Sequence, residues 1–408
     1  MELTQIEQML IEAIKAALRQ ESICLSVDDP EVWNDLFTLS LQHKLMPMVL
    51  NAVHRSAGIQ TIPGYSMMKK NAKMQIMTQS AKTVEFLELY KNLCDRGITP
   101  LVNKGILCRE LYPDGNLRQS SDEDLFVQED AFSECCDALR ELGYRPDTEP
   151  DDATYELGWK KQDGLLYIEL HRSLFSLKSS AVSGLQTFFN DAFEKAETYP
   201  IAGNEVCSLC PHDHLLYLIL HAFKHFIHSG FGIRQICDIG LWAKTYHDRI
   251  DWSTLRKQCE AVSAQKFAAA IFQIAEDELG IEISLPDEWA DRSINGMPLL
   301  KDALCAGIYG SAEKSRLHSA SVTFNAVAAE NENKNSSLLQ TIFPSVSSLE
   351  NDYPILKKRP WMQPWIWCVR LWNYRKEIRH SEKREISKTL QTAKERKTLL
   401  QYYGIISS

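Results

Sequence analysis

LVNKGILCRELYPDGNLRQSSDEDLFV, residues 101–127, decides the fold that we expect for this chain. The stretch begins with a short apolar segment, turns at Lys104-Gly105, and ends in a second apolar segment that carries Asp122 and Asp124. Residues two apart in a strand point to the same face, so the two carboxylates can converge on one hard cation. The pattern therefore indicates phosphoryl-transfer chemistry.

The hydrophobic period changes on both sides of this stretch. Upstream, it predicts helices over residues 1–20, over 30–56 with Asp28 or Asp29 as the N-cap, and over 65–96, where Gly97 ends the last one. Within the middle of the chain it predicts strands at 99–103, 122–127, 155–161 and 165–170, a strand pair within 199–208, and helices at 106–111 and 130–142. Asp163-Gly164 between two alternating runs is a hairpin signal. From Pro211 onward the helical pattern dominates.

We therefore expect an α+β fold, in which helical regions flank a small mixed β-sheet on both sides. The predicted division is an N-terminal helical region at 1–96, an α/β core at 97–210 and a C-terminal helical region with a basic tail at 211–408. A chain of 408 residues is long enough for two or three domains.

Composition narrows the class of protein. A formal net charge of −9 argues against a nucleic-acid coat. The 11 cysteines are scattered, no signal peptide is evident at Met1, and no apolar run reaches the roughly 18 residues of a membrane span. These features predict a cytoplasmic protein with free or structural thiols. Cys207 and Cys210 have CxxC spacing without a second pair, so we favour thiols over a zinc site there.

A third carboxylate is expected to join the acidic pair. In the strand at 165–170 and just beyond it, Glu169 and His171 share one face, whereas Ile168 and Leu170 share the apolar one. Three carboxylates around Mg²⁺ suit a triphosphate, because the metal neutralises it and orients the α-phosphorus for in-line attack. Acidic pairs are also common at exposed strand ends. The strand and turn context favours the metal site here.

Lys104-Gly105 and Arg118 are candidates for phosphate contacts. A glycine between a strand and a helix lets backbone N–H groups approach a phosphate, and Lys104 could hold one of its oxygens. An ordinary strand-to-helix turn is the alternative for Lys104-Gly105. A surface charge is the alternative for Arg118.

Taken in order, these motifs resemble the bacterial nucleotidyltransferase-like family of the DNA polymerase β-like superfamily. That family shows KG, YPD, R and DxDLxV, then an Asp-Leu-His element, HxxxH and a following Asp. The matching residues are Lys104-Gly105, Tyr112-Pro113-Asp114, Arg118, Asp122 to Val127, Glu169-Leu170-His171, His221 and His225 within LILHAFKH, and Asp238. Three departures are Lys104-Gly105 in place of the superfamily's usual Gly-Ser or Gly-Gly phosphate turn, Glu169 in place of Asp, and Glu123 at a position that is normally apolar. The last would suit a frayed or exposed strand start.

The resemblance implies a nucleotidyltransferase core that uses Mg²⁺ (or Mn²⁺) to transfer a nucleoside monophosphate from an NTP to a small-molecule, peptide or sugar-like acceptor. It implies Asp122, Asp124 and Glu169 as catalytic metal ligands, Lys104, Gly105 and Arg118 as nucleotide-binding residues, and His171, His221, His225 and Asp238 as residues of the substrate pocket. Packing histidines are the alternative for His221 and His225. A catalytically weak nucleotide-binding or interaction protein that keeps the fold is the alternative function.

The C-terminal segment mixes basic and aromatic residues. Trp361, Trp365, Trp367 and Trp372 lie in its first part, and basic residues dominate from Lys357 to Lys397. Such mixing can bind nucleic acid or an anionic membrane. We favour tryptophans packed on the core with 383–397 as a solvent-facing end, and nucleic acid as a less favoured partner. Residues 326–348 are expected to form a flexible loop.

Overall fold

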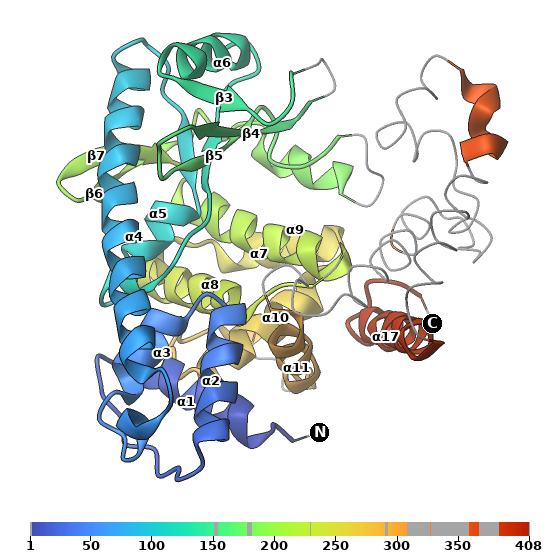
Figure 1. Ribbon diagram of the computed structural model, residues 1–408. Helices are drawn as coiled ribbons and strands as arrows, with labels where there is room; N and C mark the ends of the chain where they lie inside the picture. The colour runs from blue at the N-terminus through green and yellow to red at the C-terminus, as the bar shows by residue number, and fades with distance from the viewer. Residues whose placement is uncertain are drawn as a thin grey trace.

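The computed structural model describes residues 2–150, 154–177, 182–228, 230–289, 293–307, 327, 359–366 and 383–407. Figure 1 shows a small sheet with helices on both sides of it in sequence, which confirms the α+β expectation. The long helix α4 runs along one side of the molecule and connects the N-terminal helices to the region of the sheet (Figure 1).

Four helices precede the sheet: α1 (Gln5–Leu18), α2 (Pro30–Gln42), α3 (Met46–Val53) and α4 (Tyr65–Cys94). Thr4 caps α1 in a reciprocal capping box with Glu7. Asp29 caps α2 by accepting a hydrogen bond from the Glu31 N–H at 2.9 Å, and Pro30 stands at the first helical position. Asp29, rather than Asp28, is thus the N-cap.

The five-stranded sheet has the order β1-β2-β5-β4-β3. Its strands are β1 (Leu101–Asn103), β2 (Glu123–Phe126), β3 (Tyr144–Pro146), β4 (Glu156–Lys161) and β5 (Tyr167–His171). β2 and β5 pair in parallel, with Asp124 opposite Glu169, and the other pairs are antiparallel. The pattern did not predict β3, which is a three-residue edge strand. The parallel pair matters most, because it places the two carboxylates side by side.

Short elements and a helical layer complete the chain. The helices α5 (Gly105–Arg109) and α6 (Phe132–Glu141) belong to the sheet region, and β6 (Glu197–Ile201) and β7 (Asn204–Ser208) form a separate hairpin. The later helices are α7 (Pro211–His228), α8 (Ile233–Thr245), α9 (Trp252–Ala261), α10 (Gln265–Gln273), α11 (Met297–Ala306) and α17 (Lys383–Tyr402). Among the described helices, none is both long and apolar enough to cross a membrane.

One continuous apolar core joins these layers. It extends from the buried face of α1 through β2 and β5 to Tyr403 and Ile406 near the end of the chain. In β5, Ile168 and Leu170 are fully buried, as the alternation predicts. The proposed division of the chain at residues 96 and 210 stays a prediction.

The C-terminal segment differs from the expectation. Trp361 and Trp365 are 74% and 65% exposed, so the predicted packing of these two tryptophans is wrong. Conversely, Arg396 in the predicted solvent-facing end is only 3% exposed, and Leu400 is buried. Trp367, Trp372 and, apart from residue 327, the predicted loop at 326–348 lie outside the described residues.

Arg396 attaches α17 to the end of α7. Its guanidinium donates hydrogen bonds to the backbone carbonyl of His228 at 2.7 Å and to that of Phe226. The last carbonyls of a helix have no partner within the helix and carry partial negative charge, so a buried cation is well placed there. Local amphipathicity could not reveal this contact, because the partner lies 168 residues away in the sequence.

Replacing Arg396 with Ala is expected to lower the free energy of unfolding by about 2 kcal/mol, because one buried and one part-buried carbonyl lose their charged donor. Urea unfolding followed by circular dichroism measures the change. Lys397→Ala removes a neighbouring exposed cation and should change stability by less than about 0.5 kcal/mol. Equal effects of the two substitutions would contradict the role given to Arg396.

His43 links α2 to α11 and should make the fold sensitive to acid. Its Nε2 lies 3.1 Å from the Leu304 carbonyl, and burial, aided by the charge of Arg234, lowers its pKa to about 4. The unfolded chain binds a proton near pH 6.5 and the folded chain does not, so stability falls as pH drops from about 6.5 to 4. Protonation of this residue alone should lower the free energy of unfolding by about 2 kcal/mol as the pH falls from 7.5 to 5.

Urea unfolding of the wild type and of His43→Gln at these two pH values tests this expectation. Glutamine keeps a donor toward Leu304 but does not titrate. On lowering the pH from 7.5 to 5, the variant should therefore lose about 2 kcal/mol less of its free energy of unfolding than the wild type does. The same loss in both proteins would show that His43 is not the titrating group.

Candidate active site

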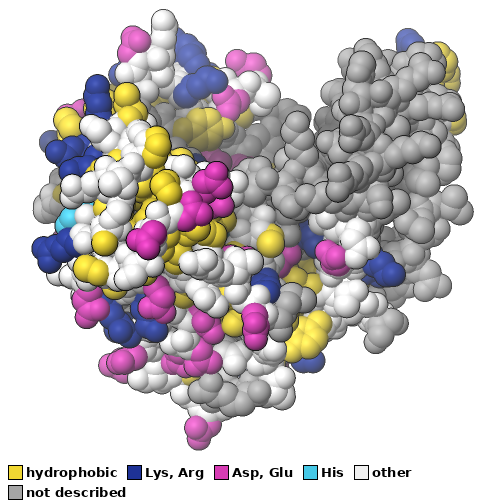
Figure 2. Space-filling model, turned by 60° about the horizontal axis from the view of Figure 1, so that its bottom comes forward, with side chains coloured by type: hydrophobic (Ala, Val, Ile, Leu, Met, Phe, Trp, Pro, Cys, Tyr) yellow, Lys and Arg dark blue, Asp and Glu magenta, His cyan; other side chains and the backbone are white. Residues whose placement is uncertain are grey.

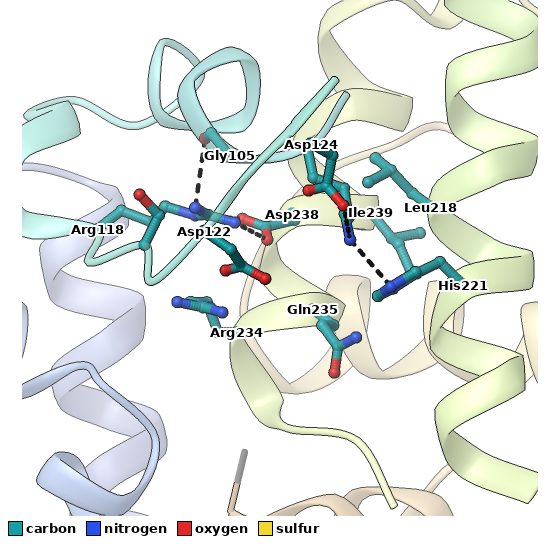
Figure 3. Close-up of a pocket in the computed structure, with 12 residues that line it drawn as sticks. Gly105, Arg118, Asp122, Asp124, Leu218, His221, Arg234, Gln235, Asp238 and Ile239 are labelled. Atoms are coloured by element: carbon teal, nitrogen blue, oxygen red, sulfur yellow. Dashed lines mark hydrogen bonds and ion pairs between the residues drawn. The ribbon is translucent and has the colours of Figure 1, made fainter. Parts of the chain in front are cut away.

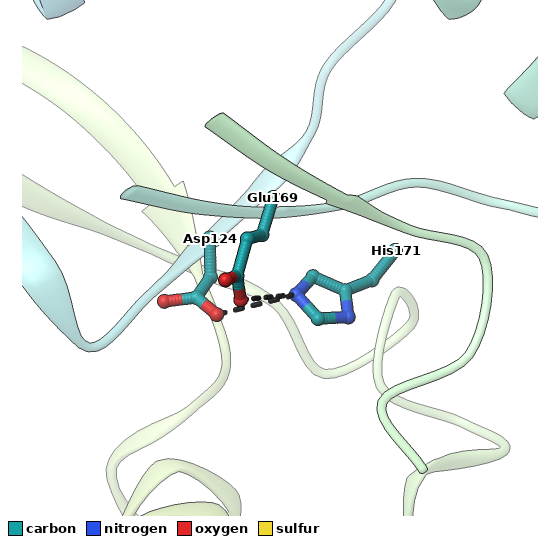
Figure 4. A group of neighbouring side chains, drawn as sticks. All are labelled: Asp124, Glu169 and His171. Atoms are coloured by element: carbon teal, nitrogen blue, oxygen red, sulfur yellow. Dashed lines mark hydrogen bonds and ion pairs between the residues drawn. The ribbon is translucent and has the colours of Figure 1, made fainter. Parts of the chain in front are cut away.

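The parallel pairing of β2 with β5 brings three potential metal ligands together. The His171 Nε2 lies 3.2 Å from the Asp124 Oδ1 and 3.8 Å from the Glu169 Oε2. One ligand atom from each of the three residues lies within 4.8 Å of the others. In Figure 4 the Asp124 and Glu169 carboxylates both reach toward the same nitrogen of His171. Oxygen and imidazole ligands at such separations can share one divalent cation.

Lys104 contacts the same oxygen of Asp124 as His171 does. Its Nζ lies 2.8 Å from the Asp124 Oδ1 and 2.9 Å from the Nε2 of His221. The backbone of Lys104 has a φ of 51°, which is unfavourable for a residue with a side chain. Its N–H donates to the Nε2 of His214 at 3.2 Å, so α7 supports the strained turn.

The two carboxylates have opposite electrostatic environments. Burial opposes ionisation of Asp124, but Lys104 and His171 outweigh it and lower the pKa of this carboxyl to about 2. Burial, together with the charge of Asp124, raises the pKa of Glu169 to about 8. Asp124 is thus a permanent anion, whereas Glu169 can hold or release a proton near neutral pH.

Glu123 is buried, contrary to the expectation of an exposed strand start. Its carboxylate accepts a hydrogen bond from the Ile106 N–H at 2.7 Å and one from the Ser120 hydroxyl at 2.9 Å, and lies 3.3 Å from the Arg109 guanidinium. The frayed-strand interpretation is wrong because this charge is neutralised and hydrogen-bonded inside the protein. Glu123 thereby fastens the start of α5 to β2.

The same carboxylate explains Gly105. This residue has a φ of +28°, and a Cβ placed on it would lie 1.9 Å from the Glu123 Oε2. Glycine is required for this close approach. The Ile106 N–H at the turn already serves an internal carboxylate. The predicted phosphate contact at Gly105 has to use other groups.

Arg118 is held in a buried ion pair with Asp238. Its Nη2 and Nε lie 2.5 Å and 3.1 Å from the two oxygens of Asp238, and Nη1 donates to the Gly105 carbonyl at 3.3 Å. The Tyr112 hydroxyl donates to the same carboxylate at 2.8 Å. This network joins α8 to the Lys104-Gly105 turn and fixes the position of both.

A pocket opens beside these residues (Figure 3). Among the predicted site residues, those that line it are Lys104, Gly105, Arg118, Asp122, Asp124, His221 and Asp238. Asp122 precedes β2 and lines the same pocket as Asp124, but it is not a member of the cluster formed by Asp124, Glu169 and His171. The predicted metal triad and the observed cluster therefore share two carboxylates.

His221 and His225 of α7 are neutral near pH 7. Burial and then the charge of Lys104 hold the pKa of His221 well below its usual range. Burial, with the charge of Lys224 next, does the same for the pKa of His225. The two Nε2 atoms lie 3.2 Å apart, so one ring donates to the other. Near neutral pH His221 accepts a hydrogen bond from Lys104 rather than acting as an acid.

Residues 29–280 match the family model described as "Uncharacterised nucleotidyltransferase", which spans more than half of the 408-residue chain. The chain belongs to this family. No curated protein and no solved structure matches it. The match includes every predicted site residue, from Lys104 to Asp238.

Three supporting residues of this nucleotidyltransferase were missing from the sequence interpretation. His214 accepts from the strained Lys104 backbone, Arg109 neutralises Glu123, and Arg234 lines the pocket. His214 has a readable signal, since it lies seven residues before His221 on the same face of a helix. Arg109 and Arg234 had none, because their partners are distant in the sequence.

Proposed function

We propose that this nucleotidyltransferase uses Mg²⁺ to transfer a nucleoside monophosphate from an NTP to a hydroxyl of a small-molecule, peptide or sugar-like acceptor. The observation that carries the proposal is the cluster of Asp124, Glu169 and His171 on two parallel strands, next to a pocket lined by Asp122 and Lys104. Family membership supports the transferase class.

The donor set fits a divalent cation. Asp124 and Glu169 offer the oxygen ligands that Mg²⁺ and Mn²⁺ prefer, whereas the imidazole nitrogen of His171 is more typical of sites for Zn²⁺ or Fe²⁺. The Nδ1 of His171 is buried without a hydrogen-bond partner, and the Glu156 Oε2 lies 3.8 Å from it. If Nε2 faces a cation, Nδ1 carries the proton and faces Glu156, an arrangement common around metal-bound histidines.

The bound cation would neutralise the triphosphate and stabilise the charge that develops on the departing pyrophosphate. The protein's own residues would prepare this step. Lys104 and His171 keep Asp124 ionised, because both favour its charged form. Glu169 would serve as a ligand of the cation, because binding of the cation displaces the proton that burial otherwise retains on this carboxyl at a pKa of about 8.

A screen with the wild-type protein tests the proposal. Each of the four NTPs is incubated with Mg²⁺ or Mn²⁺ and a metabolite and peptide extract, and mass spectrometry detects products that gain one nucleoside monophosphate. We expect product and pyrophosphate in equal amounts, loss of both with EDTA, and recovery on adding excess Mg²⁺.

One observation favours the alternative of a catalytically weak nucleotide-binding protein. The Lys104 ammonium already compensates Asp124 at 2.8 Å, so less negative charge remains for a cation. NTP binding without pyrophosphate release in any extract would support this alternative. A protein that binds no NTP at all would contradict both functions.

Nucleic acid is a less favoured acceptor. On the face shown in Figure 2, basic and acidic side chains lie beside one another, without a broad area of Lys and Arg alone among the coloured residues. Proteins that bind nucleic acid usually present a continuous basic surface. Salt-sensitive binding of RNA or DNA would revise this assignment.

A further inference from the structure

The charges that line the pocket do not all cancel. Lys104 pairs with Asp124, and Arg118 pairs with Asp238. Two lining charges remain, Arg234 and Asp122. Within the described part of the chain, neither has an oppositely charged group within 4.0 Å. The pocket thus presents one cation and one anion that are not paired with each other.

Arg234 is well placed to contact a ligand. It lies in the first turn of α8, is 5% exposed, and uses one nitrogen to donate to the Gln119 carbonyl. Its Nε and Nη2 have no hydrogen-bond partner among the residues that the structure describes. In Figure 3 the Arg118 guanidinium is turned toward Asp238, whereas no dashed line joins the Arg234 guanidinium to any of the carboxylates drawn.

Two lysines from the N-terminal helices add positive charge at the same place. Lys44, between α2 and α3, donates to the Ser121 hydroxyl, and Lys82 of α4 donates to the carbonyls of Ser120 and Ser121 at 3.2 and 3.3 Å. Burial and then the charge of Arg234 lower the pKa of Lys44, as expected where cations crowd together. Three cations therefore converge on the loop that leads into Asp122.

The backbone of Lys44 is strained. Its φ is 54°, at the end of a helix where glycine or asparagine is usual. Lys104, which holds Asp124, has a similar φ of 51°.

We propose that Arg234, assisted by Lys44, binds the polyphosphate tail of the NTP, and that Arg118 positions the Lys104-Gly105 turn instead of contacting phosphate. A metal-bound triphosphate presents both a cation and oxygen anions, which complement Asp122 and Arg234 respectively. The planar guanidinium suits two phosphate oxygens at once, and Lys44 adds a point charge. The assignment rests on the proposed function, because it names the part of the same site that receives the phosphates.

Calorimetric titration tests the assignment independently of catalysis. Inorganic tripolyphosphate without metal, and each NTP with Mg²⁺, are titrated into the wild type, Arg234→Gln, Arg234→Lys and Lys44→Gln. We expect Arg234→Gln and Lys44→Gln to weaken tripolyphosphate binding about tenfold or more, because each removes a charged hydrogen bond. Arg234→Lys should recover part of the loss.

Lys91→Gln is the matched control, since it removes an exposed cation from the same helix as Lys82 and should leave affinity unchanged. Thermal unfolding checks that each variant folds. If Arg234→Gln does not fold, Lys44→Gln and Arg234→Lys decide the question.

The outcomes separate the two proposals. If the wild type transfers a nucleotide, and Arg234→Gln and Lys44→Gln bind tripolyphosphate as tightly as the wild type does, the phosphate assignment is wrong and the proposed function stands. Weakened tripolyphosphate binding in both variants, with no transfer to any acceptor by the wild type, would support the assignment while contradicting the transferase. If the wild type binds neither tripolyphosphate nor any NTP, both proposals are wrong.

Discussion

Replacing Asp124 with Asn is expected to reduce the rate of nucleotidyl transfer by about three orders of magnitude or more, while the fold remains. The change removes the one carboxylate that Lys104 and His171 keep permanently ionised. Removing one electrostatic group aimed at a reacting centre typically lowers the rate by about 10²–10³-fold, and the loss of a metal ligand adds to this effect. Asparagine has nearly the same shape and can still accept from Lys104. Stability should therefore change less than activity.

Pyrophosphate release with a saturating NTP and acceptor measures this effect. Asp163→Asn is the matched control, because it removes an exposed carboxylate from the β4–β5 turn and should leave the rate unchanged. Full Mg²⁺-dependent activity in Asp124→Asn would show that the catalytic carboxylate lies elsewhere. Normal circular dichroism and thermal unfolding of the variant ensure that lost activity does not reflect lost structure.

Replacing Asp238 with Leu is expected to lower the free energy of unfolding by about 3–5 kcal/mol. Arg118 is 3% exposed, and Asp238 accepts two of its hydrogen bonds and one from Tyr112. Removing the carboxylate leaves a buried charge without compensation. The cost of burying an unpaired charge, rather than the loss of packing, dominates the effect.

Urea unfolding of a double variant separates these causes. Arg118→Met combined with Asp238→Leu removes both charges and should recover most of the stability. Glu197→Gln is the surface comparison, since it breaks the ion pair with the 53% exposed Arg249 side chain and should cost less than about 1 kcal/mol. If the double variant were as unstable as Asp238→Leu, the Arg118 charge would not be the cause.

Much of the site follows from local patterns. The two-residue spacing of Asp122 and Asp124, and the alternation around Glu169, predict acidic groups gathered at one region of a small sheet. The Asp163-Gly164 turn indicates the β4–β5 hairpin, which the structure confirms. These features were predictable because each depends on residues close together in the sequence.

The charge partners were not predictable in the same way. Glu123 was expected at an exposed strand start, yet Arg109 and the Ile106 N–H neutralise and bind it inside the protein. Arg118 was expected to face phosphate, and the structure pairs it with Asp238, 120 residues away. A charged residue has the same local pattern whether its partner is solvent, a ligand or a distant helix.

By itself, the sequence determined the α+β class and the family and indicated the carboxylates that we propose for the site, because strand alternation and short motifs depend on residues close together in the chain. Only the tertiary structure decided how those charges pair. The parallel register of β2 with β5 joins Asp124 to Glu169 and His171, and the packing of α2, α4 and α8 gathers Lys44, Lys82 and Arg234 around the 119–121 loop. These juxtapositions depend on the burial of apolar faces far apart in the chain, which no short pattern encodes.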